Sequence, residues 1–306
     1  MKKKLFVLGI GGLTGHKIIS KIKNDFELYG SYNLRNPDLD FVTSFKLDIT
    51  NIKKVEEILL ECNPDYIINA CAINNVDYCE SHPNEAKKIN GDFVSTLSKI
   101  SENINCKFIH LSTDSVFDGN KKMPYVETDI ANPNNIYGNT KLIGEKFALV
   151  NSNNLVVRAS VLYGGLPENI SQVNSSSMKP LNFGLWLINK LKSNEKVRII
   201  EDEFSSPIIV EDFANSIIHL LKGNYSGIFH SAPNMCINRY DFSKEIAKAL
   251  DLDLSLIEPI SNKTLGRNVK TGANKCLDST KMETLTKFKF LTLNESISLL
   301  KKFELI

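Results

Sequence analysis

A tyrosine and a lysine four residues apart are the side chains in this sequence best suited to acid–base chemistry. The run Tyr-Gly-Asn-Thr-Lys begins at Tyr137 and ends at Lys141, inside a stretch whose pattern predicts a helix over 135–150. Residues at this spacing lie on one face of a helix. A free tyrosine has a pKa of about 10, and a neighbouring ammonium favours the phenolate, so we expect Lys141 to lower the pKa of Tyr137 toward the working range.

Hydroxyl and carboxylate side chains end the predicted strand 107–112. Ser112, Thr113, Asp114 and Ser115 follow one another there, and the chain continues through Val-Phe-Asp-Gly to Gly119. Ligands bind outside the carboxyl ends of the strands in open α/β sheets, so we expect these groups to reach a ligand. The alternative is a hydroxyl-rich turn without a ligand.

A glycine-rich loop separates the first predicted strand, 5–8, from the first predicted helix, 15–23. Gly9, Gly12 and Gly15 are spaced G-x-x-G-x-x-G rather than G-x-G-x-x-G. In this context glycines let the backbone approach a pyrophosphate, and the helix N-terminus offers unpaired N–H groups. The loop favours dinucleotide binding over a purely structural turn.

The residues after the second predicted strand indicate which dinucleotide binds. An acidic side chain there would favour NAD, because it would accept hydrogen bonds from the adenosine ribose. The chain instead runs through Ser-Tyr-Asn-Leu to Arg35. Arg35 could pair with a 2′-phosphate, which favours NADPH and leaves NADH as an alternative cofactor. It could also be a solvated loop cation.

Asp48 follows the third predicted strand, in the run Leu-Asp-Ile-Thr. Its carboxylate could accept a hydrogen bond from the adenine amino group. It could also cap the helix that is predicted to begin near Ile52, and the two roles are compatible.

Composition excludes several classes of protein. Hydrophobic residues make up 42% of the 306 residues and charged residues 24%, which is enough to build a large core. The 37 basic and 35 acidic residues leave a formal charge of +2, which argues against nucleic acid or an anionic membrane as the main partner. No apolar stretch approaches the ~18 residues of a membrane span.

The six cysteines contain no C-x-x-C pair and lie mostly in apolar segments. We expect reduced thiols in a cytoplasmic protein, with no disulfide framework and no metal site.

Strand-like and helix-like patterns alternate through the first half of the chain, which predicts βαβ units and a doubly wound α/β fold. The expected strands are 5–8, 27–32, 44–47, 66–69, 107–112, 155–159, 197–200 and 227–230, and the expected helices are 15–23, 52–62, 83–103, 135–150, 182–192, 211–221, 239–250 and 294–303. The segment 164–180 is rich in turn formers and could be a loop over a binding site or a surface insertion. We expect a main domain from 1–163 plus about 205–232, and a smaller, interleaved lobe from about 164–204 plus 233–306.

Taken together, these motifs resemble the extended short-chain dehydrogenase/reductases, and within them the dTDP-4-dehydrorhamnose reductase branch. The resemblance covers nearly the whole chain and rests on the glycine loop, on the runs 64–72, 76–77, 112–119 and 157–164, on Tyr137 with Lys141, and on the runs 202–207 and 239–242. It implies a Rossmann-like fold, NADPH and hydride transfer to the C4 keto group of a nucleotide-linked deoxysugar. It also allows a homodimer.

The resemblance assigns roles residue by residue. The catalytic residues would be Thr113, Tyr137 and Lys141. Cofactor would be bound by Gly9, Gly12, Leu13, Gly15, Arg35, Asp48, Ile49, Ala70, Cys71, Ala72, Asn90, Ser112, Tyr137 and Lys141. Substrate would be bound by Asn74, Val76, Asp114, Ser115, Phe117, Ser160 and Asn182.

The sequence departs from the branch at positions that bear on the substrate. Ser115 stands where the branch usually has tyrosine, Ile208 where it commonly has threonine and Asn268 where it commonly has proline. Two alternatives therefore stay open: a nucleotide-sugar epimerase or dehydratase on the same fold, and a non-catalytic NADP-binding regulatory subunit like that of methionine adenosyltransferase.

Overall fold

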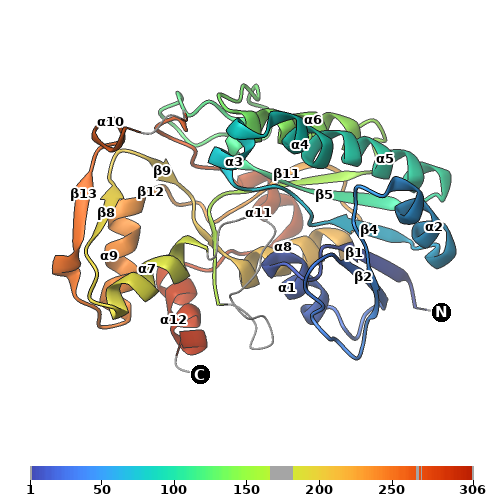
Figure 1. Ribbon diagram of the computed structural model, residues 1–306, viewed down its shortest axis with the longest axis horizontal. Coiled ribbons are helices and arrows are strands. Elements are labelled where there is room, and N and C mark those ends of the chain that lie inside the picture. The colour runs from blue at the N-terminus through green and yellow to red at the C-terminus, as the bar shows by residue number, and fades with distance from the viewer. Residues whose placement is uncertain (1, 166–181, 267–268, 270, 305–306) are drawn as a thin grey trace.

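A seven-stranded parallel sheet forms the centre of the molecule (Figure 1). The structure is a computed structural model that describes residues 2–165, 182–266, 269 and 271–304. The sheet has the order β11-β6-β5-β4-β1-β2-β3. Its strands are β1 (Lys4–Leu8), β2 (Glu27–Tyr32), β3 (Thr43–Lys46), β4 (Tyr66–Asn69), β5 (Lys107–Thr113), β6 (Leu155–Ala159) and β11 (Gly227–Ser231). The predicted doubly wound α/β class is confirmed.

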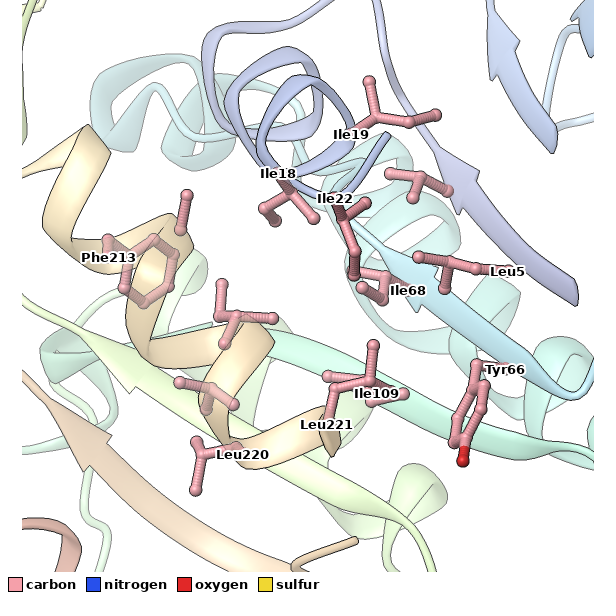
Figure 2. Packing of buried hydrophobic residues seen from close by; sticks show 14 of the residues in the cluster. Leu5, Ile18, Ile19, Ile22, Tyr66, Ile68, Ile109, Phe213, Leu220 and Leu221 are labelled. Carbon is pink, nitrogen blue, oxygen red and sulfur yellow. The ribbon is translucent and has the colours of Figure 1, made fainter. Parts of the chain in front are cut away.

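Helices cover both faces of this sheet (Figure 1). One face packs against α1 (Leu13–Lys21) and α8 (Val210–Lys222), and the other against α2 (Ile52–Cys62), α5 (Phe93–Asn103) and α6 (Ile136–Ala148). Figure 2 shows the first interface, where Ile18 of α1, Ile22 at the end of that helix and Phe213 of α8 pack in one cluster with strand residues such as Ile68. Helices thus shield both faces of the sheet from water, which explains why every residue of β4 is buried.

The chain leaves the centre of the sheet in two directions. β1 pairs with β2 on one side and with β4 on the other. The connections that follow β1 and β4 therefore diverge, and a crevice opens at the carboxyl ends of these strands. The glycine loop lies at that crevice because it joins β1 directly to α1.

Local sequence signals fix several helix ends. Asn51 accepts a hydrogen bond from the Lys54 backbone N–H and begins α2, which ends where Asn63 adopts a left-handed conformation with φ 44°. Asn135 caps α6 in the same way by accepting from Gly138 N at 2.8 Å. The asparagine before α6 therefore sets where Tyr137 stands on its first turn.

A second group of elements lies beyond one end of the sheet, on the left in Figure 1. It comprises α7 (Phe183–Lys192), β8 (Val197–Ile200), β9 (Phe204–Ser205), β12 (Ile237–Asn238), α9 (Arg239–Ala249), β13 (Ile257–Ile260), α10 (Asn262–Leu265) and α12 (Leu293–Glu304). All of these elements except β9 and α10 share a core around Tyr163 and Phe242, whose rings meet edge to face. Between them the chain returns to the main sheet through β10 (Ile208–Ile209), α8 and β11, as the interleaved arrangement expects. The exact division into two lobes stays a prediction.

Several short elements were not predicted. They are α3 (Val76–Ser81), β7 (Leu162–Tyr163), β9, β10, β12, β13, α10 and α11 (Thr280–Thr286). The predicted helix 83–103 is divided into α4 (Pro83–Lys87), a π-helical turn (Lys88–Asp92) and α5. Most of the predicted loop 164–180 lies outside the described residues.

The expectation of six free thiols is wrong. Cys236 and Cys276 form a disulfide across 40 residues of sequence, and the other four cysteines are free. The pair comes together because the chain segment 271–279 returns beside the end of β11, a tertiary contact that cysteine spacing does not reveal. In the described part of the chain no helix is both long and apolar enough to cross a membrane.

The disulfide yields a stability prediction. Closing a loop of 40 residues restricts the unfolded chain, so Cys276→Ser should lower the free energy of unfolding by about 2–4 kcal/mol. Urea unfolding of the oxidised protein would measure this loss. Dithiothreitol should destabilise the wild type but leave Cys276→Ser unchanged, and equal sensitivity of the two proteins would contradict the bridge.

Candidate active site

A cavity of about 800 Å³ lies between the carboxyl ends of the main-sheet strands and the second group of elements. Most residues that the sequence assigned to cofactor line it: Gly9, Gly12, Leu13, Gly15, Arg35, Asp48, Ile49, Ala70, Cys71, Ala72, Ser112 and Tyr137. Six of the residues assigned to substrate also line it, namely Asn74, Val76, Asp114, Ser115, Ser160 and Asn182. Four assigned residues do not: Thr113, Asn90, Lys141 and Phe117.

The glycine loop has the shape that a dinucleotide requires. Gly9 has φ +88°, and a Cβ added at Gly15 would lie 2.3 Å from the Gly9 carbonyl oxygen. The backbone at Gly15 therefore lies too close to that at Gly9 for Gly15 to carry any side chain. No side chain caps the first turn of α1. The backbone N–H groups of that turn therefore have no side-chain acceptor at the end of the helix that lines the cavity. These residues fit a pyrophosphate, because backbone donors and the helix dipole both favour an anion there.

Arg35 and Asp48 flank the same end of the cavity. The Arg35 backbone closes on the loop, since a Cβ at Gly11 would meet the Arg35 carbonyl oxygen at 2.4 Å. Asp48 accepts a hydrogen bond from Thr50 N at 2.8 Å. The alternative that Asp48 caps α2 is wrong, because Asn51 does so.

Tyr137 reaches the end of β5 because α6 approaches it closely. A Cβ added at Gly138 would lie only 2.0 Å from the Ser115 carbonyl oxygen, so only glycine allows this contact. Thr113 ends β5, and its Oγ1 accepts from Ser115 N at 3.1 Å. The Thr113 side chain also interacts with the Tyr137 phenol. Thr113 is therefore beside the phenol although it does not itself line the cavity.

Burial raises the pKa of Tyr137 well above its ordinary value. The interaction with Thr113 acts to lower this pKa and the charge of Asp114 acts to raise it, and both effects are smaller than that of burial. The expectation that Lys141 lowers the pKa of Tyr137 is not met here. The lysine ammonium turns instead to the backbone of β5, because a buried ammonium needs several acceptors and one phenol cannot supply them.

Lys141 is 2% exposed, and its Nζ donates to the Leu111 carbonyl oxygen at 2.6 Å. A second neighbour is His110 Nε2, at 3.2 Å. Burial lowers the pKa of Lys141 to about 8, while the charge of Glu145 acts to raise it.

Asp114 gathers three hydroxyl groups at the cavity wall. Its Oδ1 accepts from Thr113 Oγ1 at 3.1 Å and from Ser115 Oγ at 3.2 Å, and its Oδ2 accepts from Ser160 Oγ at 2.8 Å. Ser160 Oγ in turn accepts from Ser206 N. The Asp114 carboxylate thus joins the end of β5 to the end of β6. Through Ser160 it also holds the segment between β9 and β10 that contains Ser206.

A buried ion pair lies behind this wall. Glu145 of α6 binds Arg158 of β6 through two hydrogen bonds of 2.9 and 2.7 Å. The Ser112 hydroxyl donates to Glu145 at 2.5 Å, so Ser112 reaches the cavity but its hydroxyl is held by this pair. The pair fastens α6 to β5 and β6, the two strands whose ends form the site.

Two assigned residues serve the packing around the cavity. Phe117 is fully buried, stacked on Tyr125 with ring centroids 4.1 Å apart, and lies under the Arg158 guanidinium. Phe117 therefore does not reach a ligand in the cavity. Asn90 lies in the π-helical turn and bonds both backbone groups of Ile73, so it holds the segment that lines the cavity.

Sequence reasoning missed the far end of the cavity. The additional lining residues with polar or aromatic side chains include Tyr78, Glu85, Phe183, Glu203, Phe204, Arg239, Thr271 and Lys275. The runs 202–207 and 239–242 drew attention to three of them. The others gave no signal in the sequence, because Tyr78 and Glu85 of α3 and α4, and Phe183, Thr271 and Lys275, reach the cavity only through tertiary packing. Within the described ranges, no cluster of three or more His, Cys, Asp and Glu side chains is placed to hold a metal ion.

The fold and this site define an oxidoreductase of the extended short-chain type, and comparison with known proteins places the chain further. The family model described as "RmlD substrate binding domain" matches residues 3–303. The chain therefore belongs to the RmlD substrate-binding family.

Two reductases are similar to this protein over much of the chain. The "Probable low-salt glycan biosynthesis reductase Agl14" of Haloferax volcanii is 31% identical over 280 residues, which cover 91% of this chain and 90% of that protein. The dTDP-4-dehydrorhamnose reductase of Escherichia coli is 33% identical over 208 residues, covering 66% of this chain and 65% of that one.

Solved structures share the whole fold. A hypothetical dTDP-4-dehydrorhamnose reductase from Sulfolobus tokodaii superimposes with a TM-score of 0.82 at 28% identity, covering 96% of this chain and 99% of that one. The reductase from Bacillus anthracis in complex with NADP gives a TM-score of 0.82 at 24% identity, covering 99% of each chain, and this likeness carries the fold alone.

Cofactor preference follows from Arg35. If this guanidinium meets a 2′-phosphate, NADPH should bind more tightly than NADH. Arg35→Ala should then weaken NADPH roughly ten- to a hundred-fold, the effect of one charge-assisted contact, and leave NADH nearly unchanged. Fluorescence titration with both cofactors would measure the ratio. Arg198→Ala, at an exposed position of β8, is the control, and equal wild-type affinities would contradict the assignment.

Proposed function

We propose that this protein reduces the C4 keto group of a nucleotide-linked deoxysugar with NADPH. One observation carries the proposal: a phenol that burial keeps protonated stands beside a threonine hydroxyl at the carboxyl end of β5, in the cavity that the glycine loop opens. Ketone reduction needs a proton donor at the carbonyl oxygen, and Tyr137 is a group of this kind. The activity of the Escherichia coli relative, a dTDP-4-dehydrorhamnose reductase, supports the same reaction.

The residues divide the work. When bound, the nicotinamide supplies the hydride. Tyr137 donates its proton to the alkoxide oxygen that forms at C4, and Thr113 hydrogen-bonds the same oxygen. Lys141 is held on β5 behind the cavity wall, so its ammonium would act through its positive charge rather than through contact with the phenol or the nicotinamide ribose.

The raised pKa of Tyr137 suits reduction. A phenol whose pKa lies above its ordinary value stays protonated through the neutral range and is ready to donate. The same shift disfavours the phenolate, which would be the base for oxidation of an alcohol. The phenol is therefore in the proton-donor form that reduction of a ketone requires.

The alternatives find less support. A dehydratase needs an acid or base next to the sugar, but Asp114 already accepts from three hydroxyl groups and is held as a hydrogen-bond acceptor. A non-catalytic NADP-binding subunit has no need of a phenol beside Thr113. An assay separates all three: the protein is incubated with NADPH and a panel of nucleotide-linked 4-keto-6-deoxysugars, nicotinamide absorbance is followed and the product sugar is identified. Stoichiometric reduction supports the proposal, whereas a product formed without loss of NADPH would favour an epimerase or dehydratase.

Tyr137→Phe tests the proton donor. The change keeps the ring and removes only the hydroxyl, so NADPH affinity should stay nearly unchanged while kcat falls by ~10²–10⁴. Stopped-flow measurement of NADPH oxidation would give kcat. Tyr225→Phe, whose hydroxyl donates to the Leu285 carbonyl oxygen away from the cavity, is the matched control. Wild-type turnover by Tyr137→Phe would show that another group is the acid.

Ser115→Tyr tests selectivity for the sugar. Ser115 lines the cavity and donates to Asp114, and the related reductases usually have a larger tyrosine there. The serine leaves room for a bulkier or more polar sugar. A tyrosine should therefore shift the ratio of kcat/KM toward dTDP-4-keto-rhamnose relative to the native substrate, with little change in NADPH affinity. The ratio is measured with both sugars and both proteins, and an unchanged ratio would exclude a selective role for this position.

A further inference from the structure

The Lys141 ammonium is bound to one strand. Its Nζ lies 2.6 Å from the Leu111 carbonyl oxygen and 3.2 Å from His110 Nε2, and both residues belong to β5. The two side chains are almost completely buried, with 2% of Lys141 and none of His110 exposed. The ammonium therefore depends on acceptors within the protein.

The charged and titratable groups that face this ammonium offer it little more. Glu145, on the same helix, shares its carboxylate with Arg158 through two hydrogen bonds. Cys71, on the segment after β4, stays a neutral thiol because burial raises its pKa to about 12. Two uncharged acceptors on β5 thus supply the direct hydrogen bonds to Lys141.

His110 is suited to accept from an ammonium. Burial and the charge of Lys141 lower the pKa of His110 well below its ordinary value, so the ring is neutral and keeps a lone pair. On its other side Asn69 Nδ2 lies 3.5 Å from His110 Nδ1, and the Asn69 carbonyl accepts from Cys71 N. Both ring nitrogens therefore face N–H groups, while a neutral imidazole accepts at only one of them. The contact with the charged ammonium is the shorter one, so Nε2 accepts and Nδ1 carries the proton.

The helix leaves room for this contact. A Cβ added at Gly144, one turn after Lys141, would lie 3.0 Å from His110 Nε2 and 2.4 Å from the Asn90 carbonyl oxygen. A larger residue at Gly144 would displace the imidazole or the helix.

We propose that His110 is a positioning residue of the active site, whose neutral Nε2 accepts a hydrogen bond from Lys141 and so fixes the ammonium on β5 in its charged form. The catalytic consequence rests on the proposed function, because Lys141 acts in turnover only if the cavity reduces a keto sugar. The contact itself can be tested without substrate or cofactor.

Three variants separate the acceptor from the space that it fills. In His110→Gln the side-chain carbonyl can reach the position of Nε2, whereas in His110→Asn the shorter amide ends near the position of Nδ1. His110→Met fills similar volume without a strong acceptor. Loss of a hydrogen bond to a charged group destabilises the charged form and should lower the pKa of Lys141 by about one to two pH units.

The experiment is an NMR titration of protein labelled with ¹³C at the lysine ε-carbons, without cofactor. Lys141→Met identifies the resonance of Lys141, which should titrate near pH 8 in the wild type. We expect His110→Gln to stay close to that value and His110→Asn and His110→Met to titrate about one to two units lower. If the Gln and Asn variants titrate alike, whether both shifted or both unshifted, the proposal is overturned. The Gln and Asn pair decides even if His110→Met does not fold.

Turnover gives a second measurement. The pH profile of kcat is measured with a 4-keto sugar. The fall of kcat at high pH should move to lower pH in His110→Asn and should stay in place in His110→Gln. A merely structural role for His110 would lower kcat equally at every pH and would overturn the proposal. If the wild type reduces no keto sugar, the proposed function fails while the NMR titration still decides the role of His110.

Discussion

The active site depends on the close contact between α6 and the end of β5. Two glycines on the inner side of this helix make the contact possible, because a Cβ at Gly138 would lie 2.0 Å from the Ser115 carbonyl oxygen and one at Gly144 would lie 3.0 Å from His110 Nε2 on β5. Helices that carry side chains at such positions stay farther from their neighbours. Only this approach lets Tyr137 reach Thr113 and lets Lys141 reach the backbone of β5.

A buried ion pair then fixes the position of α6 against the sheet. Glu145 and Arg158 are almost completely buried and paired through two hydrogen bonds, and Ser112 adds a third partner. Such a pair adds little net stability, but removal of one partner would leave an unpaired charge in the core, which is costly. The pair therefore specifies how α6 lies against β5 and β6 more than it strengthens the fold. The low polarity of the same region sets the chemistry, because it keeps Tyr137 protonated and makes Lys141 a weaker base than a surface lysine.

The other half of the cavity comes from a different part of the chain. After β6 the chain builds α7 and β8, returns to the sheet as α8 and β11, and leaves again for α9 and β13 (Figure 1). This path brings Glu203, Arg239 and Lys275 to the cavity that the glycine loop begins. The disulfide between Cys236 and Cys276 ties two passages of this path next to Lys275. The end of the cavity at the glycine loop and the opposite end are thus built by segments that meet only in the folded molecule.

The sequence by itself determined the main sheet and the cofactor end of the site. Strands covered on both faces are continuously apolar, so each short apolar run between two helical segments predicted a strand. β4 and β6 begin and end at the predicted residues. The glycine loop was recognisable because strand, loop and helix are consecutive in the chain. Tyr137 and Lys141 were likewise found from their spacing on one helix.

Only the tertiary structure decided what these side chains face. The spacing of Tyr137 and Lys141 predicted mutual contact, but the ammonium binds β5 instead, since its acceptors come from a strand about thirty residues earlier in the chain. Phe117 looked like a ligand-binding residue from its neighbours in sequence and lies in the core, because Tyr125 and Arg158 enclose it. The disulfide and the far cavity wall were invisible for the same reason. Local pattern specifies elements, whereas burial, charge and contact in this protein arise between segments that are distant in sequence.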